Sequence, residues 1–291
     1  MIKDSLGERM KTYYEAIPKN KLMRRTPVII RLDGKAFHTF TKGFDKPFDA
    51  ILMKTMQDTM KDLCANIQGC VLGYTQSDEI TLVLVDYQKI NSSAWFDYEI
   101  QKMTSISAAM ATLFFNKWFR YNCAEYTETD EDFKRYARKI NTALFDSRVF
   151  NIPKEEVTNC IFWRQLDAER NSISMVGQSQ FSSKELHKKT CKDVVAMLEE
   201  QKGIIWGDLP TDQKRGSCCI KKSFFKDPDG NELSGDLVYQ MLPEGGLAWR
   251  SNDEEVPYPV DFYTKWIVDH DIPRFVGEGR EYIDRLIYVG E

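Results

Sequence analysis

The sequence predicts an α+β fold, in which an antiparallel sheet of the ferredoxin-like βαββαβ type packs against helices and is followed by a C-terminal appendage. Three observations lead to this prediction. A buried-strand pattern lies near the N-terminus, two β-rich runs flank a short polar turn, and apolar residues recur with the helical period before and after those runs. The resulting order of strand, helix, hairpin, helix and strand is that of a ferredoxin-like sheet.

The first predicted strand spans residues 28–34, where a β-branched apolar run ends at a glycine. A helix with a basic end is predicted before it, at 5–24. A second helix follows the strand after a loop, because apolar residues recur at three- and four-residue steps between Ile51 and Cys64. Asp49 is the predicted N-cap of this second helix.

The rest of the sheet pattern follows directly. Residues 71–75 and 80–85 are β-rich and flank a polar turn, which is typical of a hairpin. A long helix is predicted at 93–120, where apolar side chains again follow the helical period. A strand at 143–150 completes the sheet.

Aromatic side chains are frequent in and around the long helix, and they have two interpretations. They could be stacking platforms for bases, but at helical spacing we expect them to be core residues or partner contacts. These side chains are Trp95, Phe114, Phe115, Trp118, Phe119 and Tyr121.

The 291 residues can bury a sizeable core, and the pattern divides them into three parts. We expect residues 1–150 to form the sheet core and 151–215 to be a helical region that completes the same domain. Residues 216–291 form the predicted appendage, because prolines and glycines separate short segments there.

Composition and charge exclude several classes of protein. The formal net charge is −4, which does not by itself indicate a nucleic-acid partner, although local basic clusters occur. No apolar run approaches the roughly 20 residues of a membrane helix, and the N-terminus lacks an apolar signal core, so we expect a cytoplasmic protein without membrane contact. The seven cysteines are scattered without a Cys-x-x-Cys pair, which predicts reduced thiols rather than a zinc site.

Two acidic positions give the best indication of chemistry. Asp33 ends the first strand, and Asp78 and Glu79 lie at the hairpin turn. If the two strands are neighbours, these carboxylates meet at one edge of the sheet. With the Gly34 carbonyl they would form an all-oxygen site of the kind that Mg²⁺ prefers, and two such ions about 4 Å apart promote in-line phosphoryl displacement. The alternative is that Asp33 and Asp78 cap a loop and a turn, which are common roles for aspartate.

The segment after the first strand is a second candidate. A glycine-led loop, Gly34 followed by Lys-Ala-Phe-His, can direct successive backbone N–H groups towards a triphosphate. It is not a Walker loop, because the Gly-x-x-x-x-Gly-Lys-Ser/Thr pattern is absent. The loop alone is therefore a weak indication of nucleotide binding.

Several short segments, taken together and in order, resemble the tRNA-His guanylyltransferase superfamily, and most closely its guanylyltransferase-like members. The resemblance covers roughly residues 5–216. The segments are 31–38 (Arg-Leu-Asp-Gly-Lys-Ala-Phe-His), 46–47 (Lys-Pro), 74–79 (Tyr-Thr-Gln-Ser-Asp-Glu), Lys102, 145–149 (Phe-Asp-Ser-Arg-Val) and 163–165 (Trp-Arg-Gln).

This resemblance implies a polymerase-palm-like catalytic core with two Mg²⁺ ions. Asp33, the Gly34 carbonyl and Asp78 would hold the metals. Glu79 would be a further catalytic residue, either as a supporting metal ligand or as a group that supports the ligands from behind. The resemblance also implies contacts with nucleotides or their phosphates, with Lys46 and Ser77 acting in activation of the 5′ end. The residues concerned are Lys35, Ala36, Phe37, His38, Lys46, Ser77 and Lys102.

The implied reaction adds nucleotides to the 5′ end of a tRNA in the 3′–5′ direction. ATP first converts a 5′-monophosphate into a 5′-adenylylated end with release of pyrophosphate. The 3′-hydroxyl of an incoming nucleoside triphosphate then attacks the activated phosphate and displaces AMP, whereas a 5′-triphosphate end needs no activation. The resemblance further implies a homotetramer that grips one tRNA across subunits.

Three residues are candidates for contact with the tRNA. Arg148 and Arg164 either line the tRNA path or stabilise Asp146 and Asp167, and the sequence does not separate these interpretations. Asn171 lies where the chain departs from the family.

That departure concerns the choice of tRNA. Superfamily members that add the extra guanylate to tRNA-His carry His-Ile-Asn-Asn-Leu-Tyr shortly after the Trp-Arg-Gln element. Residues 169–174 of this chain read Glu-Arg-Asn-Ser-Ile-Ser, and only Asn171 is shared. We therefore expect repair of 5′-truncated tRNAs, in which pairing with the acceptor strand selects each nucleotide, rather than guanylate addition specific to tRNA-His.

Two alternatives come from other functional classes. A palm-fold nucleotide cyclase uses similar acids, but enzymes resembling diguanylate cyclases have a Gly-Gly-Asp/Glu-Glu-Phe turn, whereas residues 76–80 read Gln-Ser-Asp-Glu-Ile. A non-catalytic RNA-binding module would have degenerate acids, and here Asp33, Asp78 and Glu79 are all present.

Overall fold

A computed structural model describes residues 5–127, 129–226, 237–241, 247–251, 254–256 and 261–290. The chain divides into two compact units, Met1–Ile220 with Val268–Glu291, and Lys221–Ile267. The expected appendage at 216–291 is thus divided differently, since its last residues belong to the first unit. The cause is hydrophobic, because Ile272 and Phe275 are buried in the core of that unit.

The first half of the chain contains the predicted sheet pattern. Its elements are α1 (Ser5–Met10), the π-helix η1 (Lys11–Glu15), β1 (Val28–Gly34), α2 (Phe37–Phe40), α3 (Ala50–Asn66), β2 (Cys70–Gln76), β3 (Glu79–Leu84), the 3₁₀-helix η2 (Trp95–Tyr98), α4 (Ile100–Tyr126), α5 (Asp130–Ala137) and β4 (Phe145–Asn151). The helix expected at 5–24 is shorter, because it ends before Pro18, whose missing N–H interrupts a helix.

The second half begins with helices and ends with further strands. Its elements are α6 (Lys154–Gln180), α7 (Cys191–Lys202), η3 (Trp206–Asp208), α8 (Thr211–Arg215), β5 (Ser217–Lys226), β6 (Leu237–Met241), β7 (Leu247–Ser251), β8 (Glu254–Val256), β9 (Asp261–Asp269), η4 (Gly277–Arg280) and α9 (Glu281–Ile287). Strands β6, β7 and β8 form a separate antiparallel sheet in the second unit. Within the described part of the chain, no helix is long and apolar enough to cross a membrane.

The main sheet has the strand order β4-β1-β3-β2-β5-β9. Strand β1 pairs antiparallel with both β3 and β4, and β2 pairs antiparallel with both β3 and β5. The predicted order of strand, helix, hairpin, helix and strand is confirmed, as is the antiparallel character of the sheet.

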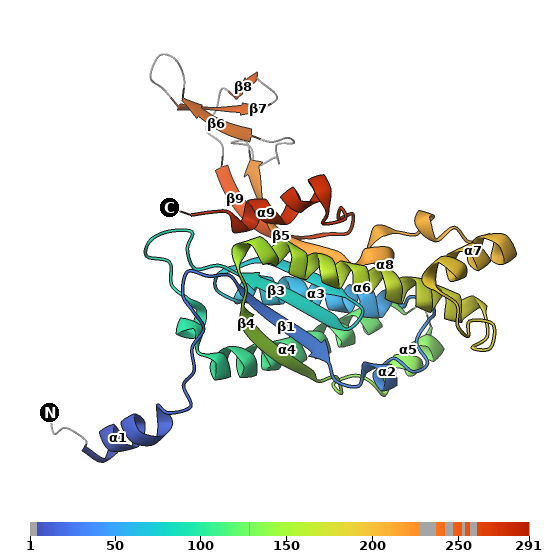
Figure 1. Ribbon diagram of the computed structural model, residues 1–291, viewed down its shortest axis with the longest axis horizontal. Coiled ribbons are helices and arrows are strands. Elements are labelled where there is room, and N and C mark those ends of the chain that lie inside the picture. The colour runs from blue at the N-terminus through green and yellow to red at the C-terminus, as the bar shows by residue number, and fades with distance from the viewer. Residues whose placement is uncertain are drawn as a thin grey trace. The chain divides into compact units, whose positions relative to one another are not determined.

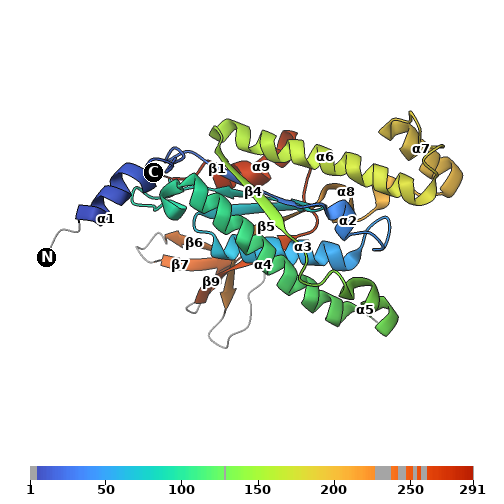
Figure 2. The same cartoon turned by 90° about the horizontal axis from the view of Figure 1, so that it is seen from below.

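Helices cover both faces of this sheet (Figures 1 and 2). Helices α3 and α4 lie on one face, and α6 and α9 lie on the other. Alternate residues of β1 serve the two layers, as the period of a strand requires, and Ile29 packs with Val157 and Ile161 of α6. The aromatic side chains Phe115 and Phe119 are fully buried, which confirms their assignment to the core.

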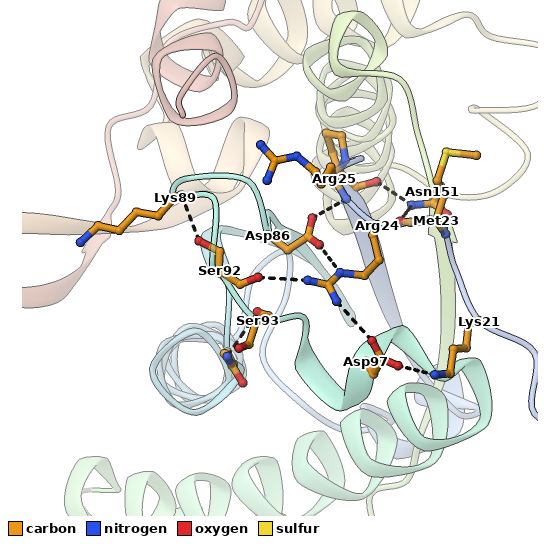
Figure 3. Close-up of polar contacts among 12 residues, drawn as sticks. Lys21, Met23, Arg24, Arg25, Asp86, Lys89, Ser92, Ser93, Asp97 and Asn151 are labelled. Carbon is orange, nitrogen blue, oxygen red and sulfur yellow. Dashed lines mark hydrogen bonds and ion pairs between the residues drawn. The ribbon is translucent and has the colours of Figure 1, made fainter. Parts of the chain in front are cut away.

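Polar contacts hold the segment before β1 to the end of the sheet at which β3 and β4 end (Figure 3). The Asp86 carboxylate accepts hydrogen bonds from Arg24 Nε at 2.5 Å and from the backbone N–H of Arg25 at 2.8 Å. Arg24 also donates to Asp97, and the Asn151 side chain bonds the backbone of Met23. This segment is therefore fixed by charge pairing and backbone hydrogen bonds instead of helix packing.

Candidate active site

Asp33 and Asp78 lie at the same edge of the sheet. Asp33 is the next-to-last residue of β1 and is paired in register with Glu79, the first residue of β3. Asp78 precedes Glu79 in the turn between β2 and β3, and its carbonyl accepts a hydrogen bond of 3.0 Å from the Gly34 backbone N–H. The antiparallel pairing of β1 and β3 thus brings together two acids that are 45 residues apart, and we call this place the acidic edge.

The electrostatics of the acidic edge are unfavourable in the absence of a cation. Burial raises the pKa of the Asp78 carboxyl, a hydrogen bond from Ser77 Oγ at 2.9 Å lowers it, and the negative charges of Asp33 and Glu79 raise it further. The net effect is a raised pKa. A carboxylate that is partly buried beside another carboxylate is stabilised when a cation binds between them.

The residues of the acidic edge fit a divalent cation that is only partly coordinated by protein. In the described ranges, no three His, Cys, Asp or Glu side chains come together as a complete metal site. Mg²⁺ is usually held by one or two carboxylates together with water and substrate phosphates. The pair of Asp33 and Asp78 matches that donor set.

Glu79 has a different environment from its two acidic neighbours. It is 4% exposed, and both of its carboxylate oxygens accept hydrogen bonds from Arg164, Oε1 from Nε at 2.7 Å and Oε2 from Nη2 at 2.8 Å. Arg31 Nη2 lies 2.8 Å from Oε2 as well, so that two guanidinium groups face one carboxylate. We call Arg31, Glu79, Arg164 and Asp167, whose carboxylate binds Arg164 at 2.8 Å, the arginine cluster.

Of the two candidate arginines, Arg164 is buried and Arg148 is exposed. Arg164 is 5% exposed and binds Glu79 and Asp167, so the interpretation that it stabilises Asp167 agrees with the structure. Arg148 lies on β4 opposite Arg31, with 60% of its side chain exposed and Asp146 at 3.7 Å. This ion pair agrees with the interpretation that Arg148 stabilises Asp146, and most of the Arg148 side chain is exposed.

The loop after β1 is shaped by one glycine. A Cβ on Gly34 would lie 2.3 Å from the ring of Phe37, so a larger residue does not fit there. The Phe37 ring itself is buried against Phe40, Phe115 and Phe145, with centroids 4.9 to 5.3 Å apart. Its side chain is therefore part of the core, whereas the side chains of the neighbouring candidates Lys35, Ala36 and His38 are exposed.

Three further candidates lie at different distances from the acidic edge. Ser77 belongs to the same turn as Asp78 and has a left-handed φ of 50°. Lys46 is exposed in the loop before α3. Lys102 lies in the first turn of α4, with Glu99 at 3.6 Å. It is about 15 Å along the helix from Thr112, whose hydroxyl oxygen accepts a hydrogen bond from the backbone N–H of Phe145 beside the edge. The structure does not bring Lys102 to the acidic edge.

A pocket lies beside Ser77 between α3, α6 and α8, and the sequence did not reveal it. Its walls combine apolar side chains with amide groups, which is the usual character of a small-molecule site. Asn171, Ser77 and Asp49, which the sequence analysis had singled out, line this pocket, but the other lining residues have no local pattern that would have marked them. They include Phe48, Met53, Met56, Gln57, Gln76, Met175 and Gln213.

Comparisons with known proteins agree with this architecture. A family model described as tRNAHis guanylyltransferase matches residues 7–153. A tRNA(His) guanylyltransferase of Debaryomyces hansenii is 24% identical over 229 residues, which cover 74% of this chain and 81% of the relative. An uncharacterized protein of Acanthamoeba polyphaga mimivirus is 30% identical over 273 residues, covering 90% of this chain and 91% of that protein.

Solved structures extend the similarity to nearly the whole chain. A bacterial tRNA(His) guanylyltransferase-like protein in complex with ATP has a TM-score of 0.74 and 37% identity, covering 98% of this chain and 100% of its own. A second structure, described as a bacterial tRNA(His) guanylyltransferase-like protein in complex with GTP, has a TM-score of 0.67 and 34% identity with the same coverage. On the strength of the family model and these relatives, the chain belongs to the tRNA-His guanylyltransferase family.

Proposed function

We propose that this protein is a nucleotidyltransferase that repairs the 5′ end of tRNA by templated 3′–5′ addition, on a polymerase-palm-like sheet. The observation that carries the proposal is the acidic edge, where Asp33 at the end of β1 pairs in register with Glu79 and its charge raises the pKa of the neighbouring Asp78 carboxyl. Homologues named tRNA(His) guanylyltransferase, and neighbours in complex with ATP and GTP, support the substrates.

The residues of the chain have separate tasks in this proposal. Asp33 and Asp78 present two carboxylates to the reacting phosphate, and the Ser77 hydroxyl fixes the orientation of Asp78. Two Mg²⁺ ions, when bound there, would polarise the phosphate oxygens and favour ionisation of the attacking hydroxyl. Glu79 acts as a positioning residue, because its arginines hold the first residue of β3 and therefore the turn that carries Asp78.

The pocket beside Ser77 is proposed to hold the base of the activating ATP. Its methionine and phenylalanine side chains offer an apolar lining, and Gln57, Gln76 and Asn171 supply amide groups for the base edge. Both stages exchange one oxygen for another at a phosphorus atom. In the first, the 5′-phosphate attacks the α-phosphorus of ATP and pyrophosphate leaves; in the second, the 3′-hydroxyl of the incoming nucleotide attacks the 5′-phosphorus of the RNA and AMP leaves. One acidic edge therefore serves both stages.

The choice of tRNA is supported by the residues at 169–174, which lie within α6. Glu169 is paired with Arg274 at 3.2 Å and Arg215 at 3.7 Å, and Ser172 accepts a hydrogen bond from Trp206. These side chains hold helices and loops of the protein together. We therefore propose that the histidine anticodon is not required. The cytoplasmic location and the homotetramer expected from the sequence stay predictions.

The experiment supplies 5′-truncated tRNA transcripts with monophosphate or triphosphate ends, nucleoside triphosphates and Mg²⁺. Extension should stop when the acceptor strand is fully paired, should need ATP only for the monophosphate end, and should proceed on tRNA-His and another tRNA alike. Failure to extend either end would overturn the proposal. Strong dependence on the histidine anticodon would overturn the choice of tRNA alone.

A further inference from the structure

Trp163 is exposed on α6 next to the arginine cluster. It is 51% exposed, and among the side chains that the structure describes no other tryptophan reaches that degree of exposure. An aromatic side chain of this size is normally buried at least on one face, because it carries a large apolar surface. We therefore expect an exposed indole beside a reaction site to bind a ligand.

The indole is held in place by two cations. The Arg164 guanidinium carbon lies 4.5 Å from the centroid of the ring, and that of Arg31 lies 5.4 Å from it. Both arginines are bound to Glu79, the residue next to Asp78. The ring is thus connected through two ion pairs to the acidic edge, which fixes its place relative to the reacting phosphate.

The face of the sheet near Trp163 presents charged side chains of the kind that contact nucleic acids. In the antiparallel pair of β1 and β4, Arg31 lies opposite Arg148 and Asp33 lies opposite Asp146, so these four side chains share one face. Because Arg31 contacts Trp163, this is the face that α6 partly covers. Arg148 is exposed and lies opposite Arg31, whose guanidinium contacts the exposed Trp163 ring. An accessible cation and an aromatic face on one surface are the groups by which proteins bind a nucleotide and its phosphate.

We propose that the Trp163 indole is a stacking platform for the nucleobase at the 5′ end of the RNA, with Arg148 binding the adjacent backbone phosphate. The inference rests on the proposed function and specifies how the protein holds the 5′ end of its RNA substrate. The platform lies apart from the pocket beside Ser77, because Trp163 is not among the residues that line it. Its position next to the acidic edge suits the RNA end whose phosphate reacts there.

The first test compares Trp163→Leu with Trp163→Phe, because leucine removes the aromatic face and phenylalanine keeps one. Trp163→Leu should weaken binding of a labelled 5′-truncated tRNA, measured directly without turnover, by about 10- to 100-fold, whereas Trp163→Phe should stay within a few-fold. Tyr121→Leu is the matched control, since Tyr121 is 53% exposed on α4, and it should leave RNA binding unchanged.

A second measurement tests whether the Trp163 indole contacts a base of the RNA or the base of the nucleoside triphosphate. Addition of RNA should quench more tryptophan fluorescence in the native protein than in Trp163→Phe, and the KM for nucleoside triphosphate should be the same in all variants. Unchanged RNA binding by Trp163→Leu would overturn the platform, and so would a rise confined to the KM for nucleoside triphosphate. Absence of RNA extension by the native protein, with Trp163-dependent binding retained, would instead overturn only the proposed function.

Discussion

The two ends of strand β3 carry aspartates with opposite surroundings. Asp86 follows the end of β3, is 1% exposed, and accepts hydrogen bonds from Arg24 and from the Arg25 backbone (Figure 3). Asp78 precedes the strand and is also largely shielded from water, but the charges near it are those of Asp33 and Glu79. Burial is therefore common to both, and the sign of the neighbouring charge distinguishes a structural acid from one that is ready to bind a cation.

Glu79 shows that this distinction holds even between adjacent residues. Its carboxylate faces two guanidinium groups, whereas the one side-chain donor to the Asp78 carboxyl among the described residues is the Ser77 hydroxyl. Ion pairs of this kind satisfy a buried carboxylate and leave little reason for it to bind a metal. The comparison thus supports the proposal that Asp33 and Asp78 bind the cation and that Glu79 is a positioning residue.

The largest effect is expected from Asp78→Asn. The amide keeps the shape of the side chain but removes one of the two charges of the acidic edge, so turnover should fall by about a thousandfold or more. The thermal midpoint should not fall, because a repulsive charge is lost. Single-turnover extension of a 5′-triphosphate tRNA and a melting curve measure the two quantities.

The matched control for this variant is Asp146→Asn. Asp146 is exposed on β4 directly opposite Asp33. The variant therefore tests whether removal of any negative charge near this edge lowers turnover. It should change turnover only a few-fold. Equal loss of turnover in Asp78→Asn and Asp146→Asn, or full turnover in Asp78→Asn, would contradict the assignment of the acidic edge.

A smaller effect of a different kind is expected at the other end of the strand. Asp86→Asn weakens the bonds to Arg24 and to the Arg25 backbone, and should lower the free energy of unfolding by about 1–3 kcal/mol. Urea unfolding measures the loss, and turnover per folded molecule should be unchanged. Loss of turnover at unchanged stability would show that this end of β3 also takes part in the reaction.

Much of the acidic edge was predictable because its determinants are local. The β-branched run before Asp33 and the polar turn at Asp78 each follow from a few neighbouring residues, and adjacent antiparallel strands necessarily bring them together. The N-cap at Asp49 was predictable for the same reason, and its side chain accepts a hydrogen bond from the backbone N–H of Leu52.

The arginine cluster could not be predicted, because its members are distant in sequence. Arg164 lies 85 residues from Glu79 and Arg31 lies 48 residues from it, and nothing near Glu79 indicates either partner. The start of the long helix was predicted too early for another reason. Phe96, Asp97 and Tyr98 all have left-handed φ values near 50°, which residues other than glycine rarely adopt and which sequence patterns do not indicate.

The smallest effect is a pH dependence of stability that follows from the raised pKa of Asp78. In the metal-free protein, the folded state holds the proton on Asp78 more tightly than the unfolded chain does. The resulting stabilisation is complete below the ordinary carboxyl pKa of 3.8 and is lost as the pH rises through the raised pKa of the folded state. Asp78→Asn lacks this change, so the native protein should lose stability relative to the variant as the pH rises from acid towards neutrality.

A divalent cation should reverse the difference in stability between the native protein and Asp78→Asn. At neutral pH, Mg²⁺ should raise the melting temperature of the native protein, because it binds the ionised pair and not the unfolded chain. It should have little effect on Asp78→Asn, whose edge retains a single carboxylate. Melting curves at several pH values, with and without Mg²⁺, test both statements. Parallel curves for the two proteins in either series would mean that Asp78 resembles Asp86, a structural acid, and that the difference between the two ends of β3 has no chemical consequence.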